Sequence, residues 1–163
     1  MRLGRKRHGG EPPADVYTGL REQIFALTPD QLGAASAGAP ILALVLETGY
    51  DEAVATLVGV VDGTTSLYFS NGGGIIGAGA HAAVAEATRR WLEAGNAFLA
   101  ALTAVADPPL PGRGMTQFVA VTPQGLRSAI AVEDDLGNNR HALSPFFHAA
   151  QDVITQIRLT QAG

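Results

Sequence analysis

Glycines crowd one stretch of the sequence, residues 70–81 (SNGGGIIGAGAH), where a predicted strand gives way to a predicted helix. Gly72, Gly74 and Gly77 have the spacing G-x-G-x-x-G, which in dinucleotide-binding proteins lets the backbone approach a pyrophosphate. That chemistry requires a parallel β-α-β unit, with a second strand after the helix. Here the preceding strand closes an antiparallel hairpin and the following residues continue as helix. The sequence therefore argues against a dinucleotide site.

Two interpretations of this glycine stretch stay open. Backbone N–H groups at a helix N-terminus can bind a small anion or ligand, and the candidate contacts are Gly72, Gly74, Gly77, Gly79, His81 and Arg140. Alternatively, the glycines adopt positive φ and allow strand and helix backbones to approach closely. Ile75 and Ile76 favour this structural role, because a phosphate cradle would carry small polar residues in their place.

Histidines could supply a general base or metal ligands. His81, His141 and His148 lie at or near predicted helix starts, so a hydrolase using one of them as base is a further hypothesis. Zinc would require three or four ligands with short spacing, and the sequence has no HxH, HExxH or His-x3-His pair. It also has no G-x-S-x-G nucleophile elbow and no cysteine. We therefore predict no catalytic residue, no metal and no cofactor.

The composition is that of a folded domain. The chain has 163 residues, of which 47% are hydrophobic and 16% charged, enough for one domain with a substantial core. Its apolar runs are far shorter than the ~18 residues that cross a membrane. No apolar segment follows the basic start, as it would in a secretion signal. We expect a cytoplasmic protein with no membrane partner.

Basic residues are concentrated at the N-terminus. Arg2, Arg5, Lys6 and Arg7 are four of 11 basic residues, which leaves seven against 15 acidic residues in the rest of the chain. An acidic body does not attract a phosphate backbone, so a nucleic-acid partner is not expected. We predict a flexible basic tail over residues 1–13 and a single α+β domain over residues 14–163.

The first half of the domain is predicted as helix and hairpin. Val16, Leu20, Ile24 and Leu27 recur at helical spacing after the possible N-cap Asp15. Residues 28–32 (TPDQL) have a capping-box pattern, which predicts a short helix. Residues 41–47 are apolar on both faces, which is typical of a strand in a sheet covered on both sides. Residues 53–61 and 64–70 are predicted as the next two strands.

The turn of this hairpin decides which side chains share a face. With Asp62 and Gly63 as the only two loop residues, Val58 would lie opposite Leu67. Leu57 and Tyr68 would then share the other, shallower face of the hairpin. We predict that face as a candidate interaction surface.

The second half continues with a long helix over residues 80–105, on which Val84, Trp91, Phe98 and Val105 are seven apart. A second hairpin is predicted over residues 115–122 and 126–133, and a last helix begins at Ser144-Pro145. The predicted fold is thus α+β, a five-stranded, mostly antiparallel sheet with three main helices in the order α-βββ-α-ββ-α.

Residues 55–74 (ATLVGVVDGTTSLYFSNGGG), followed by an amphipathic helix, resemble the central hairpin and helix of roadblock or profilin-like regulatory domains. The resemblance implies a non-catalytic dimerising scaffold. The main functional hypothesis is accordingly a non-catalytic interaction or regulatory module that binds itself or another protein. A small-ligand or anion-binding protein using the turn at residues 72–79 is the alternative, and a hydrolase is the third hypothesis.

Overall fold

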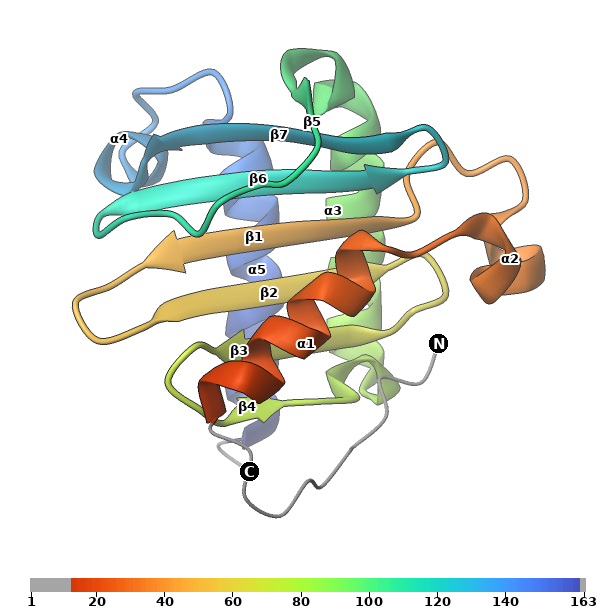
Figure 1. Cartoon of the computed structure of the whole chain (residues 1–163), viewed down its shortest axis with the longest axis horizontal. Coiled ribbons are helices and arrows are strands. Elements are labelled where there is room, and N and C mark those ends of the chain that lie inside the picture. The colour runs from red at the N-terminus through yellow and green to blue at the C-terminus, as the bar shows by residue number, and fades with distance from the viewer. Residues whose placement is uncertain (1–12, 162–163) are drawn as a thin grey trace.

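A seven-stranded antiparallel sheet forms the centre of the computed structural model, which describes residues 13–161 (Figure 1). The strand order is β4-β3-β2-β1-β6-β7-β5. The strands are β1 (Ala43–Gly49), β2 (Val54–Val60), β3 (Thr65–Phe69), β4 (Gly74–Ile75), β5 (Thr103–Val105), β6 (Met115–Thr122) and β7 (Gly125–Val132). The described residues also form five α-helices. The α+β class holds, but the predicted five-stranded sheet with three main helices is wrong.

Both additional strands are short and lie at the two edges of the sheet. Residues 74–75 form β4, which pairs with Leu67 and Tyr68 of β3. Residues 103–105 form β5, which pairs with β7. The predicted helix over residues 80–105 is therefore too long. The helix α3 (Ala82–Phe98) ends in a 3-10 turn, and Thr103 and Val105, whose β-branched side chains favour strands, continue into the sheet.

Helices cover both faces of the sheet. Figure 1 shows α1 (Pro13–Phe25) crossing one face, with α3 and α5 (Ser144–Gln161) packed side by side on the other. Two separate hydrophobic cores result. Trp91 and Phe146 anchor the core under α3 and α5, whereas Tyr17 and Ile24 pack with the valines of the opposite face. The strand β1 is buried along its whole length, which confirms the prediction of a strand covered on both sides.

The hairpin between β2 and β3 has a three-residue turn, not the predicted two-residue turn. Gly63 has a φ of +95°, and Val60 N donates a hydrogen bond to Thr64 O. The longer turn shifts the pairing by one residue, so Leu57 lies opposite Leu67 and Val58 lies opposite Ser66. Alternate residues of a strand face opposite sides of the sheet. A shift of one residue therefore changes which side chains of β2 and β3 lie on the same face.

Two short helices complete the chain. The helix α2 (Pro29–Leu32) follows the predicted capping box, in which Thr28 N donates to Gln31 Oε1 at 2.9 Å. The helix α4 (Glu133–Gly137), which was not predicted, begins where the second predicted hairpin ends. The helix α1 already begins at Pro13, so Asp15 lies in its first turn. The predicted basic tail falls almost entirely outside the described residues.

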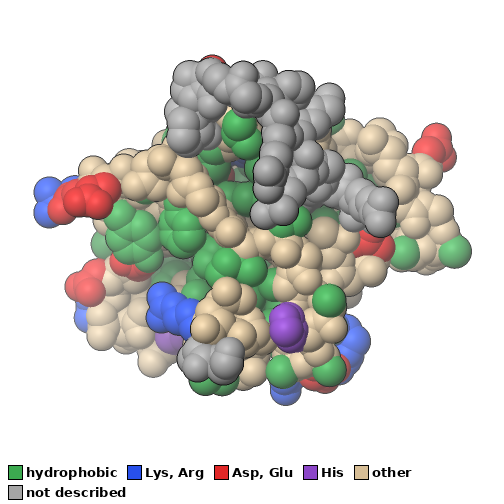
Figure 2. Space-filling model, turned by 90° about the horizontal axis from the view of Figure 1, so that it is seen from below, with side chains coloured by type: hydrophobic (Ala, Val, Ile, Leu, Met, Phe, Trp, Pro, Cys, Tyr) green, Lys and Arg blue, Asp and Glu red, His purple; other side chains and the backbone are tan. Residues whose placement is uncertain are grey.

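The β4 edge of the sheet carries apolar side chains. Figure 2 views the molecule from this side and shows hydrophobic side chains gathered in the middle of the face. Ile75 of β4 packs against the core, whereas the next residue, Ile76, is 47% exposed. Of the two isoleucines in the glycine stretch, only Ile75 therefore contributes to the core.

Candidate functional site

An open groove of about 450 Å³ runs along α3, beside the end of the β2–β3 hairpin. Its floor is apolar and includes Ile41, Val61, Ala85 and Leu92. Its rim is polar and includes Asp62, Arg89, Glu93 and Asn96. A mostly apolar concavity with a few polar groups at its edge is the usual form of a binding site in a folded protein.

The helical repeat explains why one side of α3 lines the groove. Ala85, Leu92 and Asn96 are separated by seven and four residues, so they lie along one side of the helix. The neighbouring side buries Val84 and Trp91 against the sheet. The sequence predicted this buried stripe. The groove beside it also depends on where the β2–β3 hairpin packs, and the spacing of apolar residues in the helix does not indicate that position.

Close backbone approach fixes α3 against the hairpin. A Cβ atom on Gly59 would lie 2.9 Å from Thr88 Cγ2 and 3.0 Å from the Trp91 ring, so only glycine fits there without movement. The Thr88 hydroxyl lies 2.9 Å from the Thr65 hydroxyl of β3, in a buried hydrogen bond. The β2–β3 hairpin and α3, which form the two walls of the groove, are therefore held rigidly against each other.

Arg89 of the rim is paired with glutamates on the same helix, Glu93 of the rim and the adjacent Glu86. Arg89 forms ion pairs with Glu86 at 2.6 Å and with Glu93 at 2.5 Å. The hydrogen bond from Arg89 lowers the pKa of Glu86 below its ordinary value, so Glu86 is ionised at neutral pH. All three side chains are solvent-exposed, and the rim thus presents both signs of charge beside an apolar floor.

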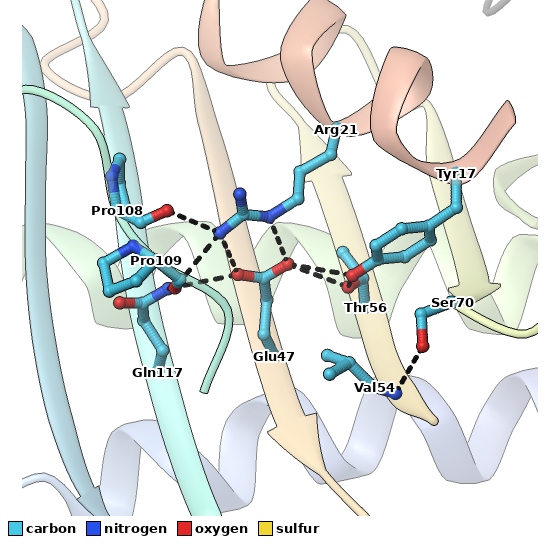
Figure 3. Close-up of polar contacts among 9 residues, drawn as sticks. All are labelled: Tyr17, Arg21, Glu47, Val54, Thr56, Ser70, Pro108, Pro109 and Gln117. Carbon is cyan, nitrogen blue, oxygen red and sulfur yellow. Dashed lines mark hydrogen bonds and ion pairs between the residues drawn. The ribbon is translucent and has the colours of Figure 1, made fainter. Parts of the chain in front are cut away.

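The most extensive polar cluster lies on the other face of the sheet, beneath α1 (Figure 3). Its centre is the carboxylate of Glu47 on β1, which is fully buried. Arg21 of α1 binds both carboxylate oxygens, and Gln117 of β6 donates to Oε1 at 3.1 Å. The hydroxyls of Tyr17 and Thr56 lie 3.2 Å and 2.9 Å from Oε2.

This cluster also holds the connector before β6. Arg21 Nη2 donates to Pro108 O at 2.8 Å, and Gln117 Nε2 donates to Pro109 O at 2.7 Å. Burial and the Glu47 charge raise the pKa of Tyr17, so its phenol keeps its proton at neutral pH. Burial would lower the pKa of Arg21, but the hydrogen bond and charge of Glu47 outweigh it and raise that pKa. Both carboxylate oxygens are occupied by protein donors, which makes this cluster a structural tie.

Sequence reasoning did not single out any residue of this cluster. The only signal is Glu47 itself, an acidic residue at the end of a run that is otherwise apolar. A buried carboxylate requires a partner, but the sequence does not indicate which of several arginines supplies it. Arg21 lies 26 residues away and Gln117 lies 70 residues away.

The glycine stretch has a clear structural role. Gly72, Gly73, Gly74 and Gly77 all have positive φ values. A Cβ atom on Gly79 would lie 2.1 Å from Gly63 O, and one on Gly74 would lie 2.5 Å from Leu67 O. These observations support the interpretation that the glycines permit backbone strain and close approach.

The proposed ligand contacts at the glycines are spread across the molecule. His81 is the N-cap residue of α3, near the β4 edge. Arg140 pairs with Asp134 and Asp135 of α4, and Figure 1 shows α4 and β4 at opposite ends of the molecule. His81 and Arg140 therefore do not meet in one pocket.

The other two histidines of the described residues are engaged locally. His141 Nδ1 accepts a hydrogen bond from Leu143 N, and His148 Nε2 lies 2.8 Å from Asn139 Oδ1. Within residues 13–161, no group of three or more histidine, aspartate and glutamate side chains is arranged to hold a metal ion.

The candidate interaction residues Leu57 and Tyr68 do not share an exposed surface. Leu57 is 1% exposed and belongs to the core under α3 and α5. Tyr68 is 4% exposed and faces α1. The one-residue shift in the hairpin separates them, and helices cover both faces.

Comparisons with protein-family models, with curated proteins and with solved structures found no match to this chain. The likeness to roadblock or profilin-like domains is thus unsupported, and the observed strand arrangement differs from the predicted one. Among the described helices, none combines the length and apolar character needed to cross a membrane.

Proposed function

We propose that this protein is a non-catalytic interaction module that self-associates through the α3 groove. The observation that carries this proposal is the open apolar groove of about 450 Å³ beside a rim of paired charges. Apolar surface that is open to solvent and bordered by polar groups is typical of a protein-binding site.

The chemistry of the rim suits a second copy of the same chain. Glu86, Arg89 and Glu93 lie along one side of α3, paired at i,i+3 and i,i+4, so a single helix surface carries both signs of charge. When two identical surfaces meet across a two-fold axis, each arginine can lie beside a glutamate of the partner. Ala85 and Leu92, seven residues apart, supply the apolar contact between the two helices.

Size-exclusion chromatography with light scattering tests self-association of the full chain. We expect a concentration-dependent dimer that is lost in Leu92→Lys, because the lysine places a charge on the apolar floor. Ala97→Lys is the matched control, since Ala97 is exposed on α3 but does not line the groove. Thermal unfolding of both variants establishes that they are folded.

A charge-exchange experiment tests the rim. Arg89→Glu and Glu93→Arg should each weaken self-association, and a mixture of the two variants should form a mixed dimer. If the protein stays strictly monomeric at a chain concentration of ~1 mM, self-association is refuted, because the dissociation constant of any dimer must then be well above ~1 mM. A dimer that is equally stable in Leu92→Lys would place the interface elsewhere.

A further inference from the structure

The turn between β3 and β4 contains the only asparagine of the sequence that is followed by glycine. All the asparagines of the chain are solvent-exposed, namely Asn71, Asn96, Asn138 and Asn139. An asparagine side chain can react with the backbone nitrogen of the next residue. Glycine shields that nitrogen least, because it has no Cβ atom. Gly72 therefore distinguishes Asn71 from the other three, which exposure alone does not.

The structure leaves this turn easy to open. Within residues 13–161, the Asn71 side chain has no hydrogen-bond partner. Gly72 N donates to Phe69 O at 3.0 Å, and Phe69 N donates to Gly73 O at 3.3 Å. Beyond them lies only β4, a two-residue strand at the edge of the sheet. Short edge segments with few buried contacts open locally at a small cost in free energy, so the hydrogen bond of the Gly72 nitrogen is readily released.

The other three asparagines are held by local structure. Asn96 lies within α3, where the next backbone N–H belongs to the hydrogen-bond ladder of the helix. Asn138 Nδ2 donates to Asp134 O at 2.6 Å. Asn139 Oδ1 lies 2.8 Å from His148 Nε2. These three residues therefore serve as internal controls of equal exposure.

We propose that Asn71 is a site of spontaneous deamidation in the folded protein. Gly72 N attacks Asn71 Cγ and closes a cyclic imide, while the bond from Cγ to the side-chain nitrogen breaks. The proton of the Gly72 N–H passes through solvent to that nitrogen, which leaves as ammonia. Water then opens the imide. Cleavage of the new bond to Cγ gives aspartate, and cleavage of the bond to the Asn71 backbone carbonyl carbon gives isoaspartate.

Both products change the β4 edge of the sheet. Each adds a negative charge to the turn, and isoaspartate also adds a carbon atom to the backbone between β3 and β4. Neither Asn71 nor Gly72 lines the α3 groove, so this proposal does not depend on self-association.

Peptide mapping by mass spectrometry of the full chain, incubated at neutral pH, tests the site. We expect the mass increase that accompanies replacement of –NH2 by –OH to accumulate at Asn71 while the other three asparagines keep their amides. The reaction should be faster at alkaline pH, because the attacking nitrogen must lose its proton. In the folded chain it should be no more than about tenfold slower than in guanidinium chloride, since local opening of the turn is inexpensive.

Two variants complete the experiment. Asn71→Gln keeps an exposed amide but must close a larger ring, so this position should stay unmodified. Asn71→Asp supplies the chromatographic standard for the aspartate product, and a second peak of the same mass then identifies isoaspartate. The proposal is overturned if Asn71 reacts in guanidinium chloride but keeps its amide in the folded chain. Equally rapid reaction at Asn138 or Asn139 would overturn it as well.

Discussion

Arg21 and Glu47 form a bidentate pair, with Nε 2.8 Å from Oε2 and Nη2 2.8 Å from Oε1. The Glu47 side chain is 0% exposed and that of Arg21 is 14% exposed, so water contributes little to the solvation of either charge. Two parallel hydrogen bonds between ionised groups are stronger and more directional than a simple ion pair. Because Arg21 lies on α1 and Glu47 lies on the central strand, this pair determines where α1 sits on the sheet.

Arg21→Met should destabilise the protein by about 3 kcal/mol, because it leaves the Glu47 carboxylate buried without its counter-charge. The second substitution in Arg21→Met/Glu47→Gln removes that charge and should recover part of the loss. Urea unfolding measures the free energy of unfolding of the single and the double variant. Arg113→Met is the matched control, since the Arg113–Asp51 pair is exposed at 79% and 67% and should contribute at most ~0.5 kcal/mol. Equal losses in Arg21→Met and Arg113→Met would contradict the structural role of the buried pair.

Stability should fall at alkaline pH through Tyr17. Burial and the Glu47 charge raise the pKa of Tyr17, so the folded state holds the phenol proton more tightly than the unfolded state. The resulting stabilisation is complete below pH ~10, the ordinary tyrosine value, and declines as the pH rises above it. Tyr17→Phe should therefore be less stable than wild type at pH 8, with a difference that narrows by pH 11. A difference that does not vary between these pH values in urea unfolding would argue against this shift.

Gly79→Ala should be strongly destabilising for a reason that involves no side-chain contact. The new Cβ atom would lie 2.1 Å from Gly63 O, so the β2–β3 turn and the start of α3 must separate. We expect a loss of at least ~2 kcal/mol, typical of a severe packing conflict. Gly112→Ala serves as the control, because a Cβ there meets nothing within 4 Å. Similar unfolding midpoints for the two variants would show that the turn adapts easily.

Gly19→Ala should have the opposite effect. Gly19 lies within α1, and a Cβ atom there would meet nothing within 4 Å. Alanine restricts the unfolded chain and has a higher helix propensity, so the substitution should stabilise the protein by about 0.5–1 kcal/mol. Thermal unfolding at neutral pH is sufficient to measure this gain. A lower midpoint would mean that α1 does not persist as a helix at Gly19.

The longer elements could be predicted from the sequence because each has a regular pattern. The stripe of Val84 and Trp91 predicted α3, and Ser144-Pro145 predicted the start of α5. The edge strands β4 and β5 have two and three residues, too few for an alternating pattern to emerge. They form because a neighbouring strand offers unpaired backbone groups, which is a tertiary effect.

The polar sites were less predictable than the elements. The Asp62-Gly63 pair indicated a turn correctly, but the turn length, and with it the orientation of Tyr68, depends on the conformation of Gly63. The α3 groove lies between elements that are distant in sequence. The pattern of each element can be predicted, but the space between them follows from how the elements pack.

The Glu47 cluster has a consequence for the order of folding. It joins residues separated by 26 and by 70 positions, so it requires α1, β1 and β6 to be in place together. Closing such long loops costs entropy before any hydrogen bond is gained, which favours late formation. We therefore expect Arg21→Met to accelerate unfolding while leaving the refolding rate nearly unchanged in stopped-flow measurements. A refolding rate that falls in proportion to stability would instead place the docking of α1 in the folding nucleus.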